Sequence, residues 1–469
     1  MKKRNSIRYY GLRIFLAVEI IFLAGCSELN TWLDEKSTLS DSRPETLTDM
    51  RAILDYAEWM NYFCPSMGDL GTDNIYMDIQ AFNSAPETQR NAYIWADVIF
   101  NEPESLDWTS AYRKIAHANV ALDGLNSIKR TSANSAEYDA VKGTALFFRG
   151  FTYYGLAQMF CKVYSESNMQ SLGLPLRITS DINITPKRSS LEQTYDQIFQ
   201  DLHEALALLP DVTSYQTRPT KTSVRGLLAR VYLNIGDFQN ALMYADMALK
   251  DNNNLLDFND SSLVNLSSFY RFPVHPLNPE IMFWAASNLH YVISPLNIMI
   301  SSVSNDLYQK YDDNDLRKKF FFAEEGENEI KFRGTYSGLN RNFAGIAVNE
   351  VILIRAECNA RIGNVSDAKE DINLLLEKRY LKGTFEPISI DHPDSLLNKI
   401  LEERRKELPF TAQLRWDDLR RLNLDERFAK TMKRELGNQV YSLPPNDPRY
   451  VFPIPLMDVQ LGDLQQNER

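Results

Sequence analysis

The pattern that most constrains the fold is a pair of predicted helices joined by a glycine turn. It reads RGLLARVYLNIGDFQNALMYADMALK and lies within residues 222–250. Its apolar residues recur every three or four positions, as on one face of a helix. Gly236 permits a tight turn, and small side chains at Ala229, Ala241 and Ala248 let the two helices approach closely. We therefore expect two consecutive helices that pack against each other.

A second stretch, within residues 349–379, repeats this spacing. It reads VILIRAECNARIGNVSDAKEDINLLLEKR and places Ala356, Gly363 and Ala368 at equivalent offsets, with Asn359 where the first stretch has an aromatic residue. Both stretches match the pattern of a tetratricopeptide repeat, in which a short turn joins two helices. The two turn glycines lie far apart in the sequence, so we do not expect the two repeats to be adjacent.

The remaining segments are of two kinds. Residues 108–160 and 192–209 have helical apolar spacing and could supply further helical pairs. The segments near 62–107 and 251–345 are irregular, and short apolar runs such as EIMFWAAS are typical of strands. We predict a mostly α fold, in which a tetratricopeptide-type scaffold carries large irregular insertions with a few short strands. Long loops on a rigid scaffold often carry binding residues.

The amino terminus has the layout of an export signal. Basic residues precede a short apolar run over residues 14–24, which is about half of the roughly 20 residues that a membrane-spanning helix needs. The sequence LAGC ends at Cys26 and resembles the lipobox of bacterial lipoproteins, although Glu19 interrupts the apolar run. We predict that Cys26 is lipidated; an ordinary signal peptide with a coincidental cysteine is the alternative.

These features divide the chain into three parts. Residues 1–25 are the predicted signal peptide, residues 26–43 a lipidated polar tether, and residues 44–469 a single body. Three cysteines fall in the body, Cys64, Cys161 and Cys358, and no CxxC spacing indicates a disulfide framework, although one pair could form. Cys358 lies in a helical pattern and is most simply a small core residue.

Charge and motifs narrow the function. The net charge of −11 disfavours binding to nucleic acid, whose phosphates an acidic surface repels. The histidines are scattered without HExxH, and Arg317 stands where a calcium loop beginning at Asp312 needs glycine. No GxSxG, GxGxxG or phosphate-binding glycine loop is present. We predict no catalytic residues, no cofactor and no metal site.

A charged run near the carboxyl terminus has two interpretations. The run ILEERRKELPFTAQLRWDDLRRLN alternates arginine and carboxylate around Trp416. It could form an anion-binding or nucleic-acid patch. We favour ion pairs that tie helices together, because each arginine has many acidic neighbours. The arginines concerned are Arg404, Arg405, Arg415, Arg420 and Arg421.

Several blocks in order carry a family resemblance. They read KGTALFFRGFTYYGLAQMF, RSSLEQTYDQIFQDLHEALALLP, PTKTSVRGLLARVYLNIGDF, LIRAECNARIGN, ERRKELPF…RWDDLRRLN and YVFPIP. In these blocks the chain resembles the SusD/RagB family of outer-membrane lipoproteins for nutrient uptake, over nearly the whole mature chain. It departs from the family at Thr411 and Ala412, where relatives often have a charged residue followed by glycine.

The resemblance implies a function. It implies a non-catalytic lipoprotein on the outside of the outer membrane that captures an oligosaccharide and delivers it to a SusC-like TonB-dependent β-barrel transporter. Two other functions stay open. One is a tetratricopeptide scaffold that binds only protein segments. The other is a lipid-anchored glycosidase, which needs two carboxylates about 5 to 9 Å apart in a cleft and cannot be identified from the sequence.

Glycan-binding residues are expected in the irregular segments. A flat aromatic ring covers the C–H face of a sugar, while polar side chains bond its hydroxyls. Aromatic rings in irregular segments with polar neighbours are therefore the candidates, with packing as the alternative for each ring. The candidate rings are Trp95, Tyr76 and Tyr291, and the candidate hydroxyl-binding residues are Asp73, Asn74 and Asn288.

Overall fold

A computed structural model describes residues 44–295, 299–326 and 329–469. The predicted signal peptide, Cys26 and the predicted tether lie outside the described residues. Contacts divide the chain after Glu45, and Thr46–Arg469 form one unit. Its helices are α2 (Leu47–Asp55), α3 (Ala57–Met60), α4 (Ile79–Ser84), α5 (Glu87–Tyr93), α6 (Leu106–Leu125), α7 (Ser135–Phe160), α8 (Leu191–Leu208), α9 (Lys221–Asn234), α10 (Phe238–Asp251), α11 (Asn305–Tyr308), α12 (Leu316–Phe321), α13 (Val348–Arg361), α14 (Val365–Glu377), α15 (Pro393–Glu407), α16 (Leu414–Leu422) and α17 (Leu456–Gly462).

The two sequence repeats are helical pairs, as predicted. The first is α9 and α10, and the second is α13 and α14. Gly236 and Gly363 have φ of +82° and +90°, a conformation that glycine adopts without strain. Neither position would place a Cβ atom within 4 Å of a neighbour, so the glycines serve the turn and not close packing.

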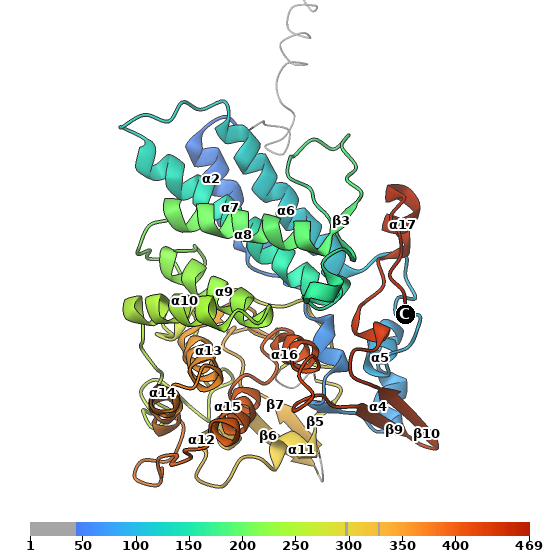
Figure 1. The fold of residues 1–469 in the computed structure, drawn as a ribbon, viewed down its shortest axis with the longest axis vertical. Helices are drawn as coiled ribbons and strands as arrows, with labels where there is room; N and C mark the ends of the chain where they lie inside the picture. Colours follow the sequence, from blue (N-terminus) through green and yellow to red (C-terminus); the bar gives the residue numbers. More distant parts are fainter. Residues whose placement is uncertain (1–43, 296–298, 327–328) are drawn as a thin grey trace, which may run out of the picture. The chain divides into compact units, whose positions relative to one another are not determined.

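The helices stack from one pair to the next. Helix α7 packs between α6 and α8, α9 packs on α10, and α13 contacts α10, α14 and α15 (Figure 1). Capping boxes at Ser190 and Thr220 fix where α8 and α9 begin, because each side chain accepts a backbone N–H of the first turn. From Val141 onward α7 is buried on nearly every side, which makes it the central helix of the core. The mostly α prediction is confirmed.

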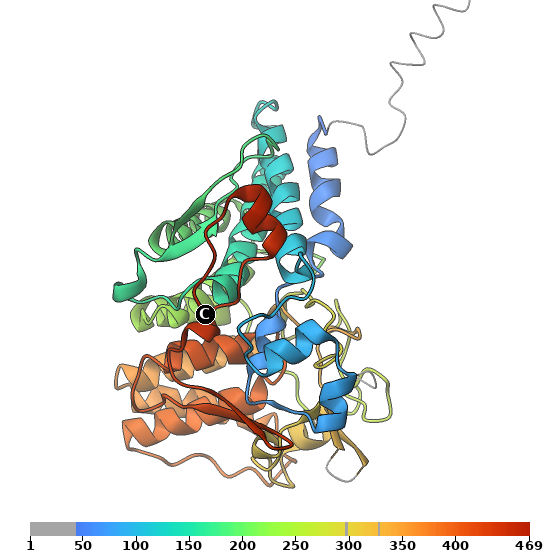
Figure 2. The ribbon, with the colours of Figure 1, turned by 90° about the vertical axis from the view of Figure 1, so that its right-hand side faces the viewer.

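The strands are short. Each sheet in the described residues is an antiparallel pair. The pairs are β1 (Ile75–Tyr76) with β5 (Ser302–Val303), β2 (Leu172–Pro175) with β3 (Arg188–Ser190), β4 (Ile281–Phe283) with β8 (Ile346–Ala347), β6 (Phe322–Gly326) with β7 (Glu329–Phe332), and β9 (Met432–Leu436) with β10 (Gln439–Leu443). Strand β4 lies in the run EIMFWAAS, which confirms the strand predicted there. The hairpin β9–β10 lies beside α4 and α5 (Figure 1, Figure 2).

The charged run near the carboxyl terminus is mostly structural, as favoured from the sequence. Four of its five arginines form ion pairs. Arg404 pairs with Asp418, Arg405 with Asp306, Arg415 with Asp73, and Arg421 with Glu357. Arg420 is the exception, because no carboxylate of the described residues lies within ion-pair distance of it. In the turn between α15 and α16, Phe410 and Gln413 have positive φ, whereas Thr411 and Ala412 do not.

A second group of charges is buried deeper and joins α12, α15 and the segment before β4. Arg317 contacts Asp315, Glu403 and Glu407 at 2.7, 2.6 and 3.2 Å. Arg379 contacts Glu280 and Glu407 at 2.7 and 2.9 Å. We call this set the ion-pair cluster: Glu280, Asp315, Arg317, Arg379, Glu403 and Glu407. None of its side chains has appreciable exposure, so each charge is neutralised by a partner and not by water.

The three cysteines of the body are free and buried, and Cys358 is a core residue as predicted. Within the described residues, no helix is both long enough and apolar enough to cross a membrane.

Candidate functional site

Trp95 belongs to the core. Only 2% of its surface is exposed, and its indole Nε1 donates a hydrogen bond of 3.0 Å to the carbonyl of Gly71. The guanidinium of Arg434 lies 5.0 Å from the ring centroid. The irregular segment around Trp95 folds back onto η2 (Met67–Gly71), and the ring fills that contact. The ring is therefore not available to cover a sugar face in this structure.

Asp73 and Asn74 hold the chain to the carboxyl-terminal helices. Arg415 donates two hydrogen bonds of 2.8 Å to the carboxylate of Asp73, and Lys430 donates a third of 2.6 Å. Burial would raise the pKa of Asp73, but the charges of Arg415 and Arg405 outweigh it and hold that pKa well below its usual range. Asn74 accepts a bond of 3.0 Å from Arg405. These side chains are engaged within the protein.

Tyr76 lies at the edge of a groove. Half of it is exposed (50%), on strand β1. The groove has a volume of about 660 Å³, and Asn305, Asp306 and Lys430 also line it. It combines one accessible ring with polar groups, which are the two features expected of a sugar site. Tyr76 therefore stays a candidate.

The other two predicted residues lie on the segment after β4. Asn288 is buried, and its backbone N–H donates 2.9 Å to the carbonyl of Cys64. Next to it, the carboxylate of Asp107 lies 3.0 Å from the ring of His290. Tyr291 is 48% exposed. The sequence thus named residues in three environments: the core, the groove at β1, and the surface around Tyr291.

Three further aromatic residues, which the sequence interpretation did not single out, are partly exposed near that surface. Trp59, Tyr62 and Phe63 follow one another on and after α3. The rings of Trp59 and Phe63 stack with centroids 5.5 Å apart and planes inclined by 30°. The guanidinium of Arg113 lies 4.3 Å from the centroid of Trp59. We call Trp59, Tyr62, Phe63 and Tyr291 the aromatic face.

Backbone pairing fixes the position of Phe63. The N–H of Cys64 donates to Ala286, and the N–H of Ala286 donates to Asn61, at 3.0 and 2.9 Å. The side-chain amide of Asn61 also donates to the carbonyls of Thr217 and Trp284. Phe63, between these anchors, has φ of +59°. A bulky residue in this left-handed conformation costs about 1–2 kcal/mol, so the surrounding bonds must hold it there.

Arg341 joins the two segments of the aromatic face. Its guanidinium lies 4.7 Å from the ring centroid of Phe63 and donates a hydrogen bond of 3.3 Å to the carbonyl of Ser287. Burial lowers the pKa of Arg341, and the phenols of Tyr62 and Tyr291 act on it electrostatically. One cation therefore lies among rings from segments more than 200 residues apart in sequence.

This arrangement suits a sugar chemically. Accessible rings cover the C–H face of a pyranose, and a guanidinium presents several N–H donors to hydroxyl oxygens. The sequence held a signal for it, the aromatic run WMNYFC before Pro65. The ring of Trp59 is partly exposed although it lies on the short helix α3. Among the described residues, no group of three or more His, Cys, Asp and Glu side chains could hold a metal ion.

Comparison with known proteins gives consistent matches. A family described as "Starch-binding associating with outer membrane" matches residues 31–233, and one described as "SusD family" matches residues 334–468; together they cover more than half of the chain. The chain is 24% identical to SusD-like protein P2 of Formosa agariphila, over 94% of this chain and 96% of that protein.

Solved structures share the fold. A putative sugar binding protein from Bacteroides vulgatus superposes with a TM-score of 0.74 at 21% identity, over 91% of this chain and 99% of that one. A SusD superfamily protein from Bacteroides thetaiotaomicron superposes with a TM-score of 0.73 at 21% identity, over 90% of this chain and all of that one. At this identity the likeness concerns the fold.

Proposed function

Because the chain belongs to the SusD family, we propose that it captures an extracellular oligosaccharide and does so at the aromatic face. The observation that carries this proposal is the convergence of partly exposed rings from two distant segments around Arg341. The description of one matching family, which names starch binding, and the sugar-binding description of the Bacteroides vulgatus protein support it.

Binding at the aromatic face requires an arginine side chain to move, because Trp59 and Phe63 each have the other ring on one face and a guanidinium on the other. The stacked rings of Trp59 and Phe63 offer a platform for one face of a sugar ring, and Tyr291 extends it. Arg113 and Arg341 lie over the rings with N–H groups available for hydroxyl or ring oxygens. The backbone bonds around Asn61 and Cys64 hold the platform in place before the ligand arrives, which reduces the entropy lost on binding.

Calorimetry on single alanine variants tests this site. Maltoheptaose is the first probe, followed by the strongest ligands from a glycan array. We expect Trp59→Ala to weaken binding about tenfold, equivalent to about 1.4 kcal/mol. Tyr291→Ala should weaken it as well. Tyr76→Ala is the matched variant, because Tyr76 and Tyr291 are almost equally exposed. Loss of binding in Tyr76→Ala with unchanged affinity in Trp59→Ala would move the site to the groove at β1.

A release assay separates binding from hydrolysis. The purified protein is incubated with each bound oligosaccharide, and new reducing ends are measured. We expect none above the blank. Release of reducing sugar would instead favour a glycosidase, which uses two carboxylates at a separation set by its mechanism.

We further propose that the protein is anchored through lipid on Cys26, faces the outside, and passes its ligand to a SusC-like TonB-dependent transporter. The LAGC sequence and the outer-membrane description of the matching family support this. Cys26→Ala should abolish lipid labelling and release the protein from outer membranes. Purification from native membranes in mild detergent should recover the transporter with the wild-type protein. Recovery of the free protein alone, where the transporter is abundant, would contradict the partnership.

A further inference from the structure

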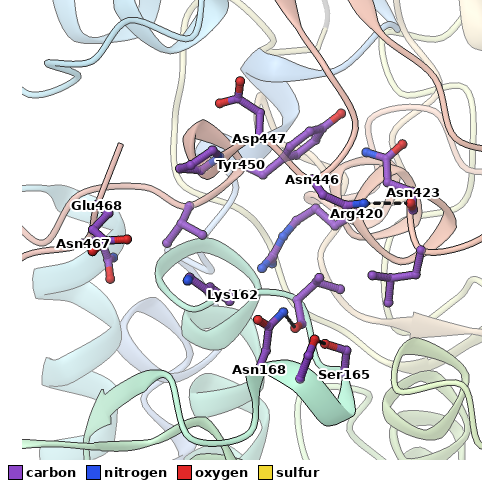
Figure 3. Close-up of a pocket in the computed structure, with 15 residues that line it drawn as sticks. Lys162, Ser165, Asn168, Arg420, Asn423, Asn446, Asp447, Tyr450, Asn467 and Glu468 are labelled. Atoms are coloured by element: carbon purple, nitrogen blue, oxygen red, sulfur yellow. Dashed lines mark hydrogen bonds between the residues drawn. The ribbon is translucent and has the colours of Figure 1, made fainter.

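A second pocket, of about 360 Å³, shares no residue with the aromatic face (Figure 3). It lies between the loop that follows α7, the end of α16, the turn before η5 (Pro448–Tyr450) and the carboxyl-terminal residues. This volume falls at the lower end of the range of small-molecule sites. A pocket of this size can hold one sugar ring with its substituents.

Arg420 distinguishes this pocket from the other arginine sites of the charged run. It is only 3% exposed, and its terminal nitrogens donate to the backbone carbonyls of Gln158 and Cys161. Its Nε has no hydrogen-bond partner among the described residues. The other four arginines of the run each have a carboxylate. A buried charge without an opposite charge is costly, and such an exception needs an explanation.

The two acidic residues of α16 do not supply that charge. Burial raises the pKa of Asp417 well above its usual range, which favours the neutral carboxyl. The next residue, Asp418, is already engaged by Arg404 and Arg421. Arg420 therefore stays uncompensated within its own helix.

A second cation lines the same pocket. Lys162 is exposed and forms no hydrogen bond or ion pair with its side chain among the described residues, although it stands in a strongly acidic protein (Figure 3). Two carboxylates also line the pocket. Arg449 neutralises Asp447 with two bonds of 2.9 Å. Glu468 is exposed. The pocket thus has two cations without an ion pair against one such carboxylate.

The rest of the lining is neutral and suits hydroxyl groups. Ser165, Asn168 and Asn446 present hydroxyl and carboxamide groups, and Val163 and Leu424 supply apolar wall. The amide of Asn446 is fixed by a bond of 3.0 Å to the carbonyl of Asn423 (Figure 3). The lining therefore combines what a hydroxylated ring needs with positive charge, which an uncharged sugar does not need.

We propose that this pocket binds one sugar unit that carries an acidic group, either a carboxylate or a sulfate ester. The inference rests on the proposed function, since it assumes a saccharide ligand. It adds that the ligand is an acidic glycan and that the chain contacts it at two separate places. The acidic group bonds Lys162 and is attracted by the buried charge of Arg420, and the ring hydroxyls bond the serine and asparagine side chains.

The test measures binding of four probes to the full-length protein in detergent by calorimetry: glucuronate, glucose 6-sulfate, glucose and inorganic sulfate. We expect both acidic sugars to bind and glucose to bind at least about tenfold more weakly. Lys162→Ala should weaken both acidic sugars about fivefold, and Lys162→Arg should restore most of the affinity. Glu468→Gln should tighten binding about twofold, because it removes a repelling charge.

Controls separate the charge from the fold. Lys129→Ala removes an exposed lysine elsewhere and should change nothing. Arg420→Gln removes a buried residue and is interpreted only if its melting temperature stays near that of the wild type; Lys162 is on the surface and does not share this difficulty. Equal binding of glucose, unchanged affinity in Lys162→Ala, or inorganic sulfate binding as tightly as the acidic sugars would each overturn the proposal.

The two proposals can fail independently. Trp59→Ala should leave the affinity for glucuronate unchanged, because Trp59 does not line the pocket. If oligosaccharides do not depend on Trp59 but glucuronate still depends on Lys162, the aromatic face is wrong and the pocket stands. If oligosaccharides depend on Trp59 and glucuronate does not depend on Lys162, the pocket is wrong and the aromatic face stands.

Discussion

The ion-pair cluster and the aromatic face use the same kinds of side chain in opposite ways. In the cluster, Arg317 and Arg379 have carboxylate partners and are sealed from water. At the aromatic face, Arg113 and Arg341 lie over partly exposed rings. Where every charge has a partner, no donor remains for a ligand. Where arginines lie over accessible rings, donors remain beside a surface that a sugar can cover.

The first prediction breaks the cluster. Glu403 accepts bonds from Arg317, Lys399 and Lys406, at 2.6, 2.8 and 3.1 Å. Glu403→Ala leaves the buried Arg317 short of a partner and should lower the free energy of unfolding by about 3–5 kcal/mol. Glu402→Ala is the matched control, because the neighbouring residue forms partly exposed pairs and should cost less than about 1 kcal/mol. Thermal melting of both variants measures the difference.

Equal melting temperatures for the two variants would contradict the contrast. It would mean that the buried pairs contribute no more than the surface pairs, and that the cluster owes its stability to apolar packing. Glycan affinity should stay unchanged in both variants as long as they are folded, since neither residue belongs to the aromatic face.

The second prediction concerns Trp95, which the sequence placed among the sugar-binding rings. Its ring packs beside Gly71 and Arg434, so Trp95→Ala should leave a cavity and destabilise the protein by about 3–5 kcal/mol. Calorimetry on the folded fraction should then show glycan affinity close to that of the wild type. A folded variant with unchanged stability and tenfold weaker binding would restore the original assignment.

Trp95 also shows which features of the structure can be predicted from the sequence and which cannot. Helical periodicity and turn glycines are local signals, so the helical pairs around Gly236 and Gly363 could be predicted with their boundaries nearly right. Whether a ring in an irregular segment is exposed depends on what folds over it. The segment of Trp95 packs against η2 and the β9 residue Arg434, neither of which is close in sequence.

The sequence contains the aromatic run before Pro65, but for the same reason it does not show that this run lies beside Tyr291. Phe63 and Tyr291 come together around Arg341 and through the pairing of Cys64 with Ala286, all of which are long-range contacts. The charged run was predictable as structure, because arginine and carboxylate in such density find each other. The density of charged residues could not reveal that Arg420 is an exception, because the neighbouring Asp418 pairs with Arg404 and Arg421.

The third prediction uses pH. Burial would raise the pKa of Glu357, but Arg421 and Arg361 outweigh it and lower that pKa to about 2 from its ordinary value of 4.5. A carboxylate with a lowered folded-state pKa stabilises the protein above its unfolded pKa. This stabilisation, about 3 kcal/mol, is fully present at pH 7 and is lost as the pH falls from about 4.5 to 2.

Urea midpoints at pH 7, 5, 4 and 3 test this for wild type and Glu357→Gln. We expect the variant to be less stable at pH 7 and the difference between the two proteins to shrink as the pH falls. Asp391→Asn serves as the control, because that carboxylate is exposed and pairs only with Lys369. A difference that stays constant down to pH 3 would mean that Glu357 is not held ionised by its arginines.

The last prediction concerns Phe63 of the aromatic face, which has a strained backbone and a ring proposed to bind the ligand. Phe63 has φ of +59° between two backbone anchors, and its ring stacks on Trp59. Phe63→Gly removes the ring but also removes the strain of the left-handed conformation, which costs a bulky residue about 1–2 kcal/mol. Phe63→Ala removes the ring and keeps most of the strain.

We therefore expect both variants to weaken oligosaccharide binding about tenfold, while the melting temperature of the glycine variant stays at or above that of the alanine variant. If the strained conformation serves to present the ring, the affinities of the two variants fall together while their melting temperatures differ. A glycine variant that melts well below the alanine variant would mean that the left-handed conformation at this position carries little strain.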